Sequence, residues 1–228
     1  YLNTFNRKKP GMNYNLLRGK KGVIFGALNE NSIAWKVAER CYEEGADIVL
    51  TNAPVALRMG EVHDLAKKLN TKVIPADATS LHDLEKMFNQ AMKKFGGQID
   101  FVLHSIGMSP NVRKGIPYNQ INYENYQKTL DISALSFHKV LQTCVKLDAL
   151  REWASVVALT YIAAQRTMAG YGDMADAKAV LESIARSFGH LYGFQKKVRI
   201  NTVSQSPTMT TAGSGIKGFD SYLDFAER

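Results

Sequence analysis

A tyrosine and a lysine seven residues apart are the side chains in this sequence best suited to chemistry. Tyr171 and Lys178 are the first and last residues of the run YGDMADAK. On an α-helix this offset is about 700° of rotation, so both side chains face the same way, about 10 Å apart along the axis. A nearby ammonium favours the ionised form of a phenol and lowers its pKa. The pair is therefore suited to protonating an oxyanion beside a hydride donor.

A second tyrosine, Tyr161, stands ten residues before Tyr171, at the end of the apolar run 155–160. Each residue has an ordinary structural explanation when taken alone. The chain has ten tyrosines, which often pack half-buried, and a helical lysine can extend its ammonium to solvent along an apolar stem. The joint spacing of all three residues after a strand-like run favours a shared site. Tyr171, Lys178 and Tyr161 are therefore the candidate catalytic residues.

Strand-like and helix-like segments alternate along the chain and must position these side chains. Short continuous apolar runs between amphipathic helices indicate a parallel sheet covered on both faces. The fold class predicted is α/β, a doubly wound parallel sheet (Rossmann fold) in a single domain. We expect strands at 21–26, 47–51, 72–75, 99–104, 155–160 and 198–203. We expect helices at 32–44, 55–69, 81–95, 123–147 and 174–192.

The two ends of the sequence differ in character from its middle. Residues 1–11 are polar and basic, and we expect a disordered extension there, with the folded domain over 12–228. Residues 205–228 are rich in Ser, Thr, Pro and Gly and then become helical. A lid over a cleft and a surface connection both fit that composition.

Composition narrows the function classes. The 228 residues are 45% hydrophobic, and no apolar run approaches the roughly 18 residues of a membrane span, so we expect no membrane partner. Cys41 and Cys144 predict reduced thiols and a cytoplasmic protein. The net charge of +8 is mostly scattered, and solvated helix ends explain it best. Without an aromatic-basic motif we expect no nucleic-acid partner, and an acidic protein partner would also fit. The five histidines lack metal-ligand spacing, and His104 is expected to pack rather than react.

A glycine-containing turn follows the first expected strand, where a dinucleotide fold binds phosphate. Gly26 allows the backbone to turn sharply, and Ser32 can cap the following helix. The N–H groups and positive dipole end of that helix attract pyrophosphate. The turn is not a G-x-G-x-x-G motif, and a helix cap without a ligand explains Ser32 equally well.

Three further strand ends should reach the same edge of the sheet. Asp77-Ala78 offers a carboxylate for an adenine amino group, and Ser105-Ile106-Gly107 permits close approach to a ribose. Residues 206–210 offer hydroxyls and N–H groups for a carboxamide or a phosphate. Ligands in such sheets collect at the carboxyl ends of strands, so the three ends together favour a cofactor cleft.

Residues at the end of the second strand are expected to contact the adenosine ribose and so to distinguish NADH from NADPH. Residues 51–54 read Thr-Asn-Ala-Pro, with no carboxylate for a 2′-hydroxyl and no cation for a 2′-phosphate. Arg58, on the next expected helix, is the nearest candidate cation. The choice between NADH and NADPH therefore stays open on the residues alone.

At this point the sequence resembles the bacterial enoyl-[acyl carrier protein] reductases, which are divergent short-chain dehydrogenase/reductases, over Met12 to Arg228. It looks most like the version from the Bacteroides group. Ordinary members of the superfamily use Tyr-x3-Lys with an upstream serine, whereas the x6 spacing with an upstream tyrosine is specific to the enoyl reductases. The motifs that carry the resemblance are Gly26-x5-Ser32-Ile33-Ala34, His104-Ser105-Ile106-Gly107, Leu159-Thr160-Tyr161, Tyr171-x6-Lys178, and Pro207-Thr208-x-Thr210 followed by residues 212–216.

The resemblance assigns roles to individual residues. It implies that Tyr171 contacts a thioester carbonyl, that Tyr161 lines the same pocket, and that Lys178 holds the nicotinamide ribose. Residues expected beside the acyl substrate are Ser109, Tyr161, Met174 and Phe219. Residues expected to bind cofactor are Gly26, Ser32, Ile33, Ala53, Asp77, Ala78, Ser105, Ile106, Gly107, Lys178, Thr208, Met209, Thr210, Thr211 and Ala212.

The same resemblance implies an activity and partners. The expected reaction is reduction of the double bond of trans-2-enoyl-[acyl carrier protein], the final reductive step of fatty acid elongation, with NADH favoured and NADPH open. Acyl carrier protein and a homotetramer are the implied partners. The family's pattern continues past Arg228 with another helix and a seventh strand. A carbonyl reductase, a non-catalytic dinucleotide-binding protein and an inactive truncated subunit remain the alternatives.

Overall fold

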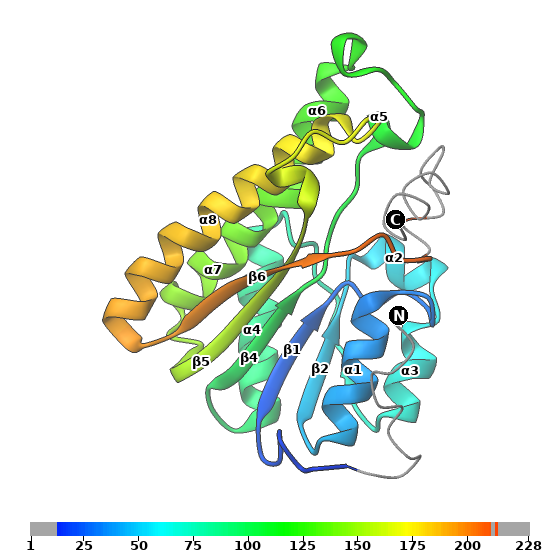
Figure 1. The fold of residues 1–228 in the computed structure, drawn as a ribbon. Helices are drawn as coiled ribbons and strands as arrows, with labels where there is room; N and C mark the ends of the chain where they lie inside the picture. Colours follow the sequence, from blue (N-terminus) through cyan, green and yellow to red (C-terminus); the bar gives the residue numbers. More distant parts are fainter. Residues whose placement is uncertain (1–12, 211–212, 214–228) are drawn as a thin grey trace.

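The computed structural model describes residues 13–210 and Gly213. Its six strands form one parallel sheet in the order β3-β2-β1-β4-β5-β6 (Figure 1). The strands are β1 (Lys21–Phe25), β2 (Asp47–Thr51), β3 (Lys72–Val73), β4 (Ile99–His104), β5 (Leu150–Tyr161) and β6 (Arg199–Gln205). The doubly wound α/β sheet expected from the sequence is confirmed. The strand order reverses between β1 and β4, and this is where such sheets bind ligands.

Helices cover the sheet in two layers, each with its own apolar core (Figure 1). One core joins the sheet to α4, α7 and α8, and the other joins β1 and β2 to α1, α2 and α3. The helices are α1 (Ile33–Glu43), α2 (Pro54–Met59), α3 (Val62–Lys68), α4 (Leu81–Phe95), α5 (Pro110–Arg113), α6 (Tyr123–Leu130), α7 (Ser136–Lys146) and α8 (Gly172–Lys196). A π-helical turn at Asp131–Leu135 joins α6 to α7, and 3₁₀ turns occupy Tyr118–Gln120 and Ile162–Ala164.

The helix expected over 55–69 was a wrong prediction, because α2 and α3 are separate helices. Gly60 is extended (φ −112°, ψ 173°), and the N–H of Glu61 donates to the Leu28 carbonyl at 2.9 Å. A Cβ on Gly60 would lie 2.6 Å from that carbonyl oxygen. The break therefore comes from close contact with the loop after β1, which helical periodicity does not reveal.

The helix expected over 123–147 is also interrupted, by the π-helical turn at 131–135. The Ser133 hydroxyl in this turn accepts from the N–H of Met108 at 2.9 Å and donates to the Met108 carbonyl at 3.1 Å. The turn thus holds the loop that follows β4. Such turns often mark functional sites.

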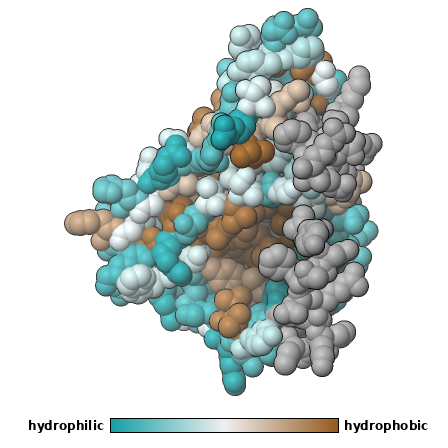
Figure 2. Space-filling model, in the orientation of Figure 1, coloured by the Kyte–Doolittle hydropathy of each residue, from teal (hydrophilic) through white to brown (hydrophobic). Residues whose placement is uncertain are grey.

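On the sheet face that carries α1 and α3, helices cover one half and leave part of the other half without a helix. The α1 and α3 layer covers the β1 to β3 half, and its core also buries Leu103 of β4, whereas no described helix lies over β5 and β6 on that face (Figure 1). The ring of Phe101 lies against Gly22, whose Cβ, if present, would be 2.1 Å from it. Val203 is 49% exposed. Figure 2 shows apolar surface gathered over this part of the sheet.

Candidate functional site

Most of the expected site residues come from loops at the carboxyl ends of the strands, and Met174 and Lys178 come from α8. Gly26 ends the first of these strands, and its backbone (φ +94°) lies in the region that glycine favours. A Cβ there would be 2.0 Å from the Ser105 carbonyl oxygen. The loops after β1 and β4 therefore touch through their backbones, and cofactor binding by Gly26 and Ser105 stays a prediction.

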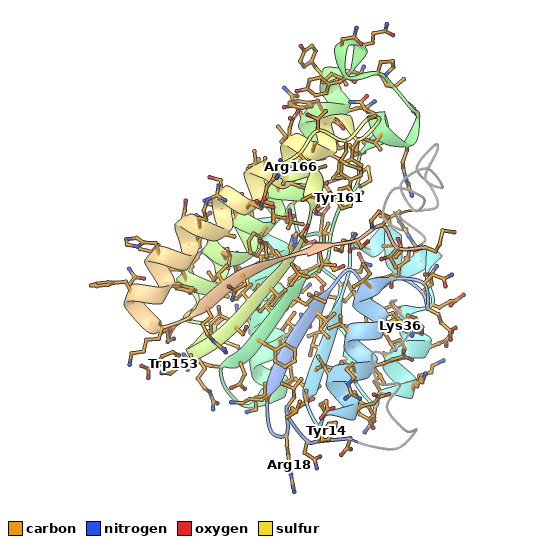
Figure 3. All side chains as sticks on the ribbon, in the orientation of Figure 1. Tyr14, Arg18, Lys36, Trp153, Tyr161 and Arg166 are labelled. Atoms are coloured by element: carbon orange, nitrogen blue, oxygen red, sulfur yellow. The ribbon has the colours of Figure 1, made fainter. Side chains whose placement is uncertain are left out.

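Tyr161 and Tyr171 form a ring pair. Their ring centroids are 4.8 Å apart with planes tilted by 47°. Tyr161 is the last residue of β5 and is 6% exposed, and Tyr171 stands directly before α8 (Figure 3 labels Tyr161). The structure thus brings together the two phenols that the sequence placed in one pocket.

The prediction that Tyr171 and Lys178 both lie on one helix is wrong for Tyr171. The helix begins at Gly172, so Tyr171 is its flanking residue, and Gly172 itself has a positive φ of 38°. A simple helical repeat therefore does not relate the two side chains. Lys178 lies in the second turn, on the buried face of α8.

Lys178 lies between the ends of β4 and β5. Its Nζ donates to the Leu159 carbonyl at 2.9 Å and to the Ile106 carbonyl at 3.3 Å. A Cβ on Gly107 would lie 3.7 Å from this Nζ and 3.8 Å from the Met174 methyl carbon. The structure therefore brings Lys178 together with three further predicted site residues. Burial lowers the pKa of Lys178 to about 8.

The lowered pKa of Lys178 predicts how stability depends on pH. The unfolded lysine titrates near its ordinary value of about 10.4, so between pH 8 and that value the unfolded chain binds more protons than the folded chain. The free energy of unfolding should therefore rise with pH across this window, by about 3 kcal/mol in total, and the penalty is fully present below pH 8. Urea unfolding of the ligand-free protein at several pH values measures the rise.

The control for this prediction is Lys178→Met, which keeps the apolar stem and removes the titrating group. The free energy of unfolding of the wild type should rise relative to that of Lys178→Met as pH rises through the window, because only the wild type titrates there. A difference independent of pH would show that the lysine titrates alike in both states.

His104 is a packing residue, as predicted. It is fully buried between the rings of Phe25 and Phe137, and its Nε2 lies 2.9 Å from the Ser136 hydroxyl. Burial and the nearby charge of Lys178 lower its pKa to about 3. The imidazole is therefore neutral at physiological pH.

The predicted role of Ser32 as a helix cap is wrong in detail. Ser32 does occupy the position before α1, but its hydroxyl makes no capping bond. It accepts from the Leu28 N–H at 3.1 Å and donates to the Asn29 carbonyl at 2.7 Å. The side chain closes the loop instead, and the helix start is left without a side-chain cap.

A cavity of about 770 Å³ adjoins the start of α1. Its lining includes five of the expected cofactor residues, namely Ser32, Ile33, Thr208, Met209 and Thr210. Residues not expected from the sequence, including Leu16, Leu17 and Arg40, line the rest. The expected contacts of Thr211, Ala212 and Phe219 fall outside the described residues, as does most of the expected lid over 205–228.

The remaining expected cofactor residues lie at the ends of β2 and β3. The Asp77 carboxylate accepts from the N–H and the hydroxyl of Thr79, and Ala78 is buried. Ala53 precedes α2. Sequence reasoning missed Asn52, whose amide donates to the Ala27 carbonyl and accepts from the Ala53 N–H, each at 2.9 Å. An Asn at a strand end was the available signal.

Ser109 is 3% exposed and has two partners within the protein. Its hydroxyl donates to the Asp173 carboxylate at 2.6 Å and accepts from the Val112 N–H at 3.0 Å, which caps α5. Contact with an acyl chain stays a prediction for this residue.

Glu182 is a second residue that sequence reasoning missed. It lies one helical turn after Lys178, is 8% exposed, and accepts from the Thr160 hydroxyl at 2.8 Å and the Gln165 amide at 3.1 Å. Lys178 and Glu182 together fix α8 to the strand end that carries Tyr161. A pair at i, i+4 with opposite charge was the available signal.

The groups at the carboxyl ends of the strands fit a nicotinamide dinucleotide. The N–H groups at the start of α1 have no side-chain cap, and a helix N-terminus favours phosphate. Within the described residues the buried Oε1 of Gln205 has no hydrogen-bond partner, and it is an acceptor suited to a carboxamide N–H. No three His, Cys, Asp or Glu side chains gather as metal ligands in the described ranges. None of the described helices is long and apolar enough to cross a bilayer.

Comparison with known sequences identifies relatives over nearly the whole chain. A family model described as enoyl-(acyl carrier protein) reductase matches residues 26–228. Enoyl-[acyl-carrier-protein] reductase [NADH] 1 of Rhizobium meliloti is 35% identical over 213 residues, which are 93% of this chain and 76% of the relative. The corresponding NADH enzyme FabI of Rickettsia typhi is 31% identical over 94% of this chain and 80% of the relative.

Solved structures agree with these relatives. The FabI–NADH complex from Alistipes finegoldii is 66% identical with a TM-score of 0.92, covering 94% of this chain and 76% of that one. The enoyl-[acyl-carrier-protein] reductase (NADH) from Aquifex aeolicus is 28% identical with a TM-score of 0.81, covering 92% and 80%. The likeness to the Alistipes protein confirms the predicted resemblance to the Bacteroides-group version.

Proposed function

This chain belongs to the enoyl-(acyl carrier protein) reductase family, and we propose that it reduces the carbon–carbon double bond of a trans-2-enoyl thioester held on acyl carrier protein. The reaction is the final reductive step of fatty acid elongation, and the reductant is NADH. The observation that carries the proposal is the Tyr161–Tyr171 ring pair, whose two residues come from the elements that Lys178 joins.

NADH supplies the hydride when it is bound. Gly26 and the uncapped start of α1 would hold its pyrophosphate, and Lys178 would hold the nicotinamide ribose hydroxyls. Two of the three N–H donors of the lysine have carbonyl partners, which aim the ammonium at the loop after β4. Backbone contact at Gly26 keeps this loop close to the loop after β1.

Tyr171 has the central chemical role in this proposal. When hydride reaches C3 of the acyl chain, negative charge develops on the thioester oxygen, and the Tyr171 phenol donates a hydrogen bond or its proton to that oxygen. Packing against Tyr161 fixes the ring, so the hydroxyl needs little reorganisation as the charge develops. The positive charge of Lys178 favours the anionic state of the site.

The end of β2 supports NADH over NADPH. Residues 51–54 contain no cation, and the amide of Asn52 has two protein partners. A 2′-phosphate would therefore lack a charged partner in this segment. We expect kcat/KM with NADH to exceed that with NADPH at least tenfold, or by about 1.4 kcal/mol.

An activity assay on the purified chain tests the function. With crotonyl or longer enoyl thioesters, loss of nicotinamide absorbance should accompany appearance of the saturated thioester, and simple ketones should give no turnover. Ketone reduction without enoyl reduction would favour the carbonyl reductase alternative. Tight NADH binding without either reaction would favour a non-catalytic protein.

The homotetramer and the cytoplasmic location belong to the same proposal. The exposed face of α8 carries Val180, Leu191 and Phe194, the last of them 89% exposed. Apolar residues on one helix face favour association between subunits. Light scattering should give four times the mass of the chain, and a monomer would contradict the tetramer. The unpaired Cys41 and Cys144 support a cytoplasmic location, which cell fractionation tests.

A further inference from the structure

The carboxylate of Asp173 lies two residues after Tyr171 and is fully buried. It accepts three hydrogen bonds, all from uncharged groups. Ser109 Oγ donates at 2.6 Å, Asn111 Nδ2 at 2.8 Å and Thr129 Oγ1 at 3.1 Å. The donors belong to the loop after β4, to α5 and to α6, so one side chain joins three separate parts of the structure to the start of α8.

The donors are themselves held in place. Asn111 Nδ2 also donates to the Asn122 carbonyl at 3.1 Å, and its Oδ1 accepts from the Asn122 N–H at 3.2 Å. Thr129 Oγ1 has a single proton, which it shares between the Asn125 carbonyl at 2.7 Å and the Asp173 carboxylate at 3.1 Å, so its bond to Asp173 is the weakest of the three. The carboxylate is therefore the centre of a connected polar network, and such networks favour one arrangement of a core.

The start of α8 needs an anchor of this kind. The first N–H groups of a helix have no partners within it, and helix ends fray unless something holds them. The side chain of Tyr171, which flanks the helix, makes no capping bond. A buried carboxylate in the first turn interacts favourably with the helix dipole, and its three donors offset the cost of its burial.

The same network reaches the cofactor side of the site. Ser109 follows Gly107 by two residues, and Gly107 packs beside Lys178 and Met174. The Ser109–Asp173 bond thus sets the spacing between the first turn of α8 and the loop after β4. We propose that Asp173 is a positioning residue, which holds the Tyr171 phenol at its reactive place opposite that loop. This inference rests on the proposed enoyl reductase function.

Three variants of the full chain test the proposal. Asp173→Ala removes the acceptor, so kcat per NADH-binding site should fall about 30-fold, because misplacement of a catalytic group by about 1 Å can cost 100-fold. Asp173→Asn should stay within about threefold of wild type, because its amide can accept from Asn111 and donate to Ser109 Oγ. Asp176→Ala is the matched control, since Asp176 lies on the same helix and its carboxylate bonds to the phenols of Tyr118 and Tyr126, neither of which is assigned to the site; it should leave kcat unchanged.

Amide hydrogen exchange gives a readout that does not depend on activity. In Asp173→Ala, exchange at residues 172–176 should accelerate about tenfold, and in the other two variants it should not. Loss of kcat per site together with faster exchange in the alanine variant, reversed in the asparagine variant, supports the proposal. Unchanged kcat per site in a folded Asp173→Ala protein overturns it, whether or not the exchange changes.

The experiments distinguish a failure of the proposed function from a failure of the positioning role of Asp173. If the wild-type chain binds NADH and reduces no enoyl thioester, the proposed function fails. Exchange at 172–176 then still decides whether Asp173 anchors the helix start. If the wild type is active and all three variants match it, only the positioning role of Asp173 is removed.

Discussion

Replacing Tyr171 with Phe should lower kcat for enoyl thioesters about 100- to 1,000-fold while leaving the affinity for NADH within about twofold of wild type. The substitution removes one oxygen and keeps the ring that packs at 4.8 Å against Tyr161. The acid that stabilises the thioester oxygen is then missing, and the binding groups for the cofactor remain. Steady-state kinetics with crotonyl thioester, together with NADH titration by fluorescence, measure the two quantities.

Tyr118→Phe is the control for loss of a phenol. Tyr118 is 60% exposed, and its hydroxyl donates to the Asp176 carboxylate at 3.0 Å, outside the residues assigned to the site. We expect wild-type kcat for this variant. Wild-type rates in Tyr171→Phe would remove Tyr171 from the role of acid, and a loss of NADH affinity would assign it to binding.

Replacing Gly26 with Ala should have the largest effect on folding and on cofactor binding. The new Cβ would lie 2.0 Å from the Ser105 carbonyl oxygen, and the backbone angle of +94° disfavours any side chain. Strain and overpacking together should lower the free energy of unfolding by about 3 kcal/mol, or about 10 °C in Tm for a chain of this size. NADH affinity should also fall, because the loops after β1 and β4 must separate.

Gly19→Ala separates backbone strain from the clash. Gly19 also has a positive φ (+74°), but a Cβ there would meet nothing within 4 Å. We expect a loss of about 1 kcal/mol, with wild-type affinity for NADH. Equal losses of stability in the two variants, measured by thermal unfolding, would show that contact with Ser105 contributes nothing.

The alternation of strands and helices along the chain, the parallel sheet and the loops at the carboxyl ends of its strands followed from sequence patterns alone. Apolar runs of five or six residues between amphipathic helices specify a parallel sheet, and the end of each run places a loop at its edge. Tyr161, Ile106 and Gly107 reach the site for this reason. Local sequence contains enough information when the position of a residue depends on where its own strand ends.

Features that depend on distant contacts did not follow from the sequence. The break at Gly60 results from contact with Leu28, and the π-helical turn contains Ser133, which bonds to Met108. The Ser32 hydroxyl is a local exception, because its partners Leu28 and Asn29 lie only four and three residues before it, and the residue types did not decide between this loop and a helix cap. Asp173 stood just before the helix expected over 174–192 and was not singled out, because its partners are 44 to 64 residues away in the chain.

The tyrosine pair also has an optical consequence. Two phenol chromophores held 4.8 Å apart at 47° in a fixed, chiral setting interact with each other when they absorb light. Circular dichroism in the near ultraviolet is sensitive to such fixed aromatic packing and is lost when tertiary packing is lost. The reacting phenol and its neighbour therefore act as a spectroscopic label built into the protein, which can report the arrangement of the site when no reaction takes place.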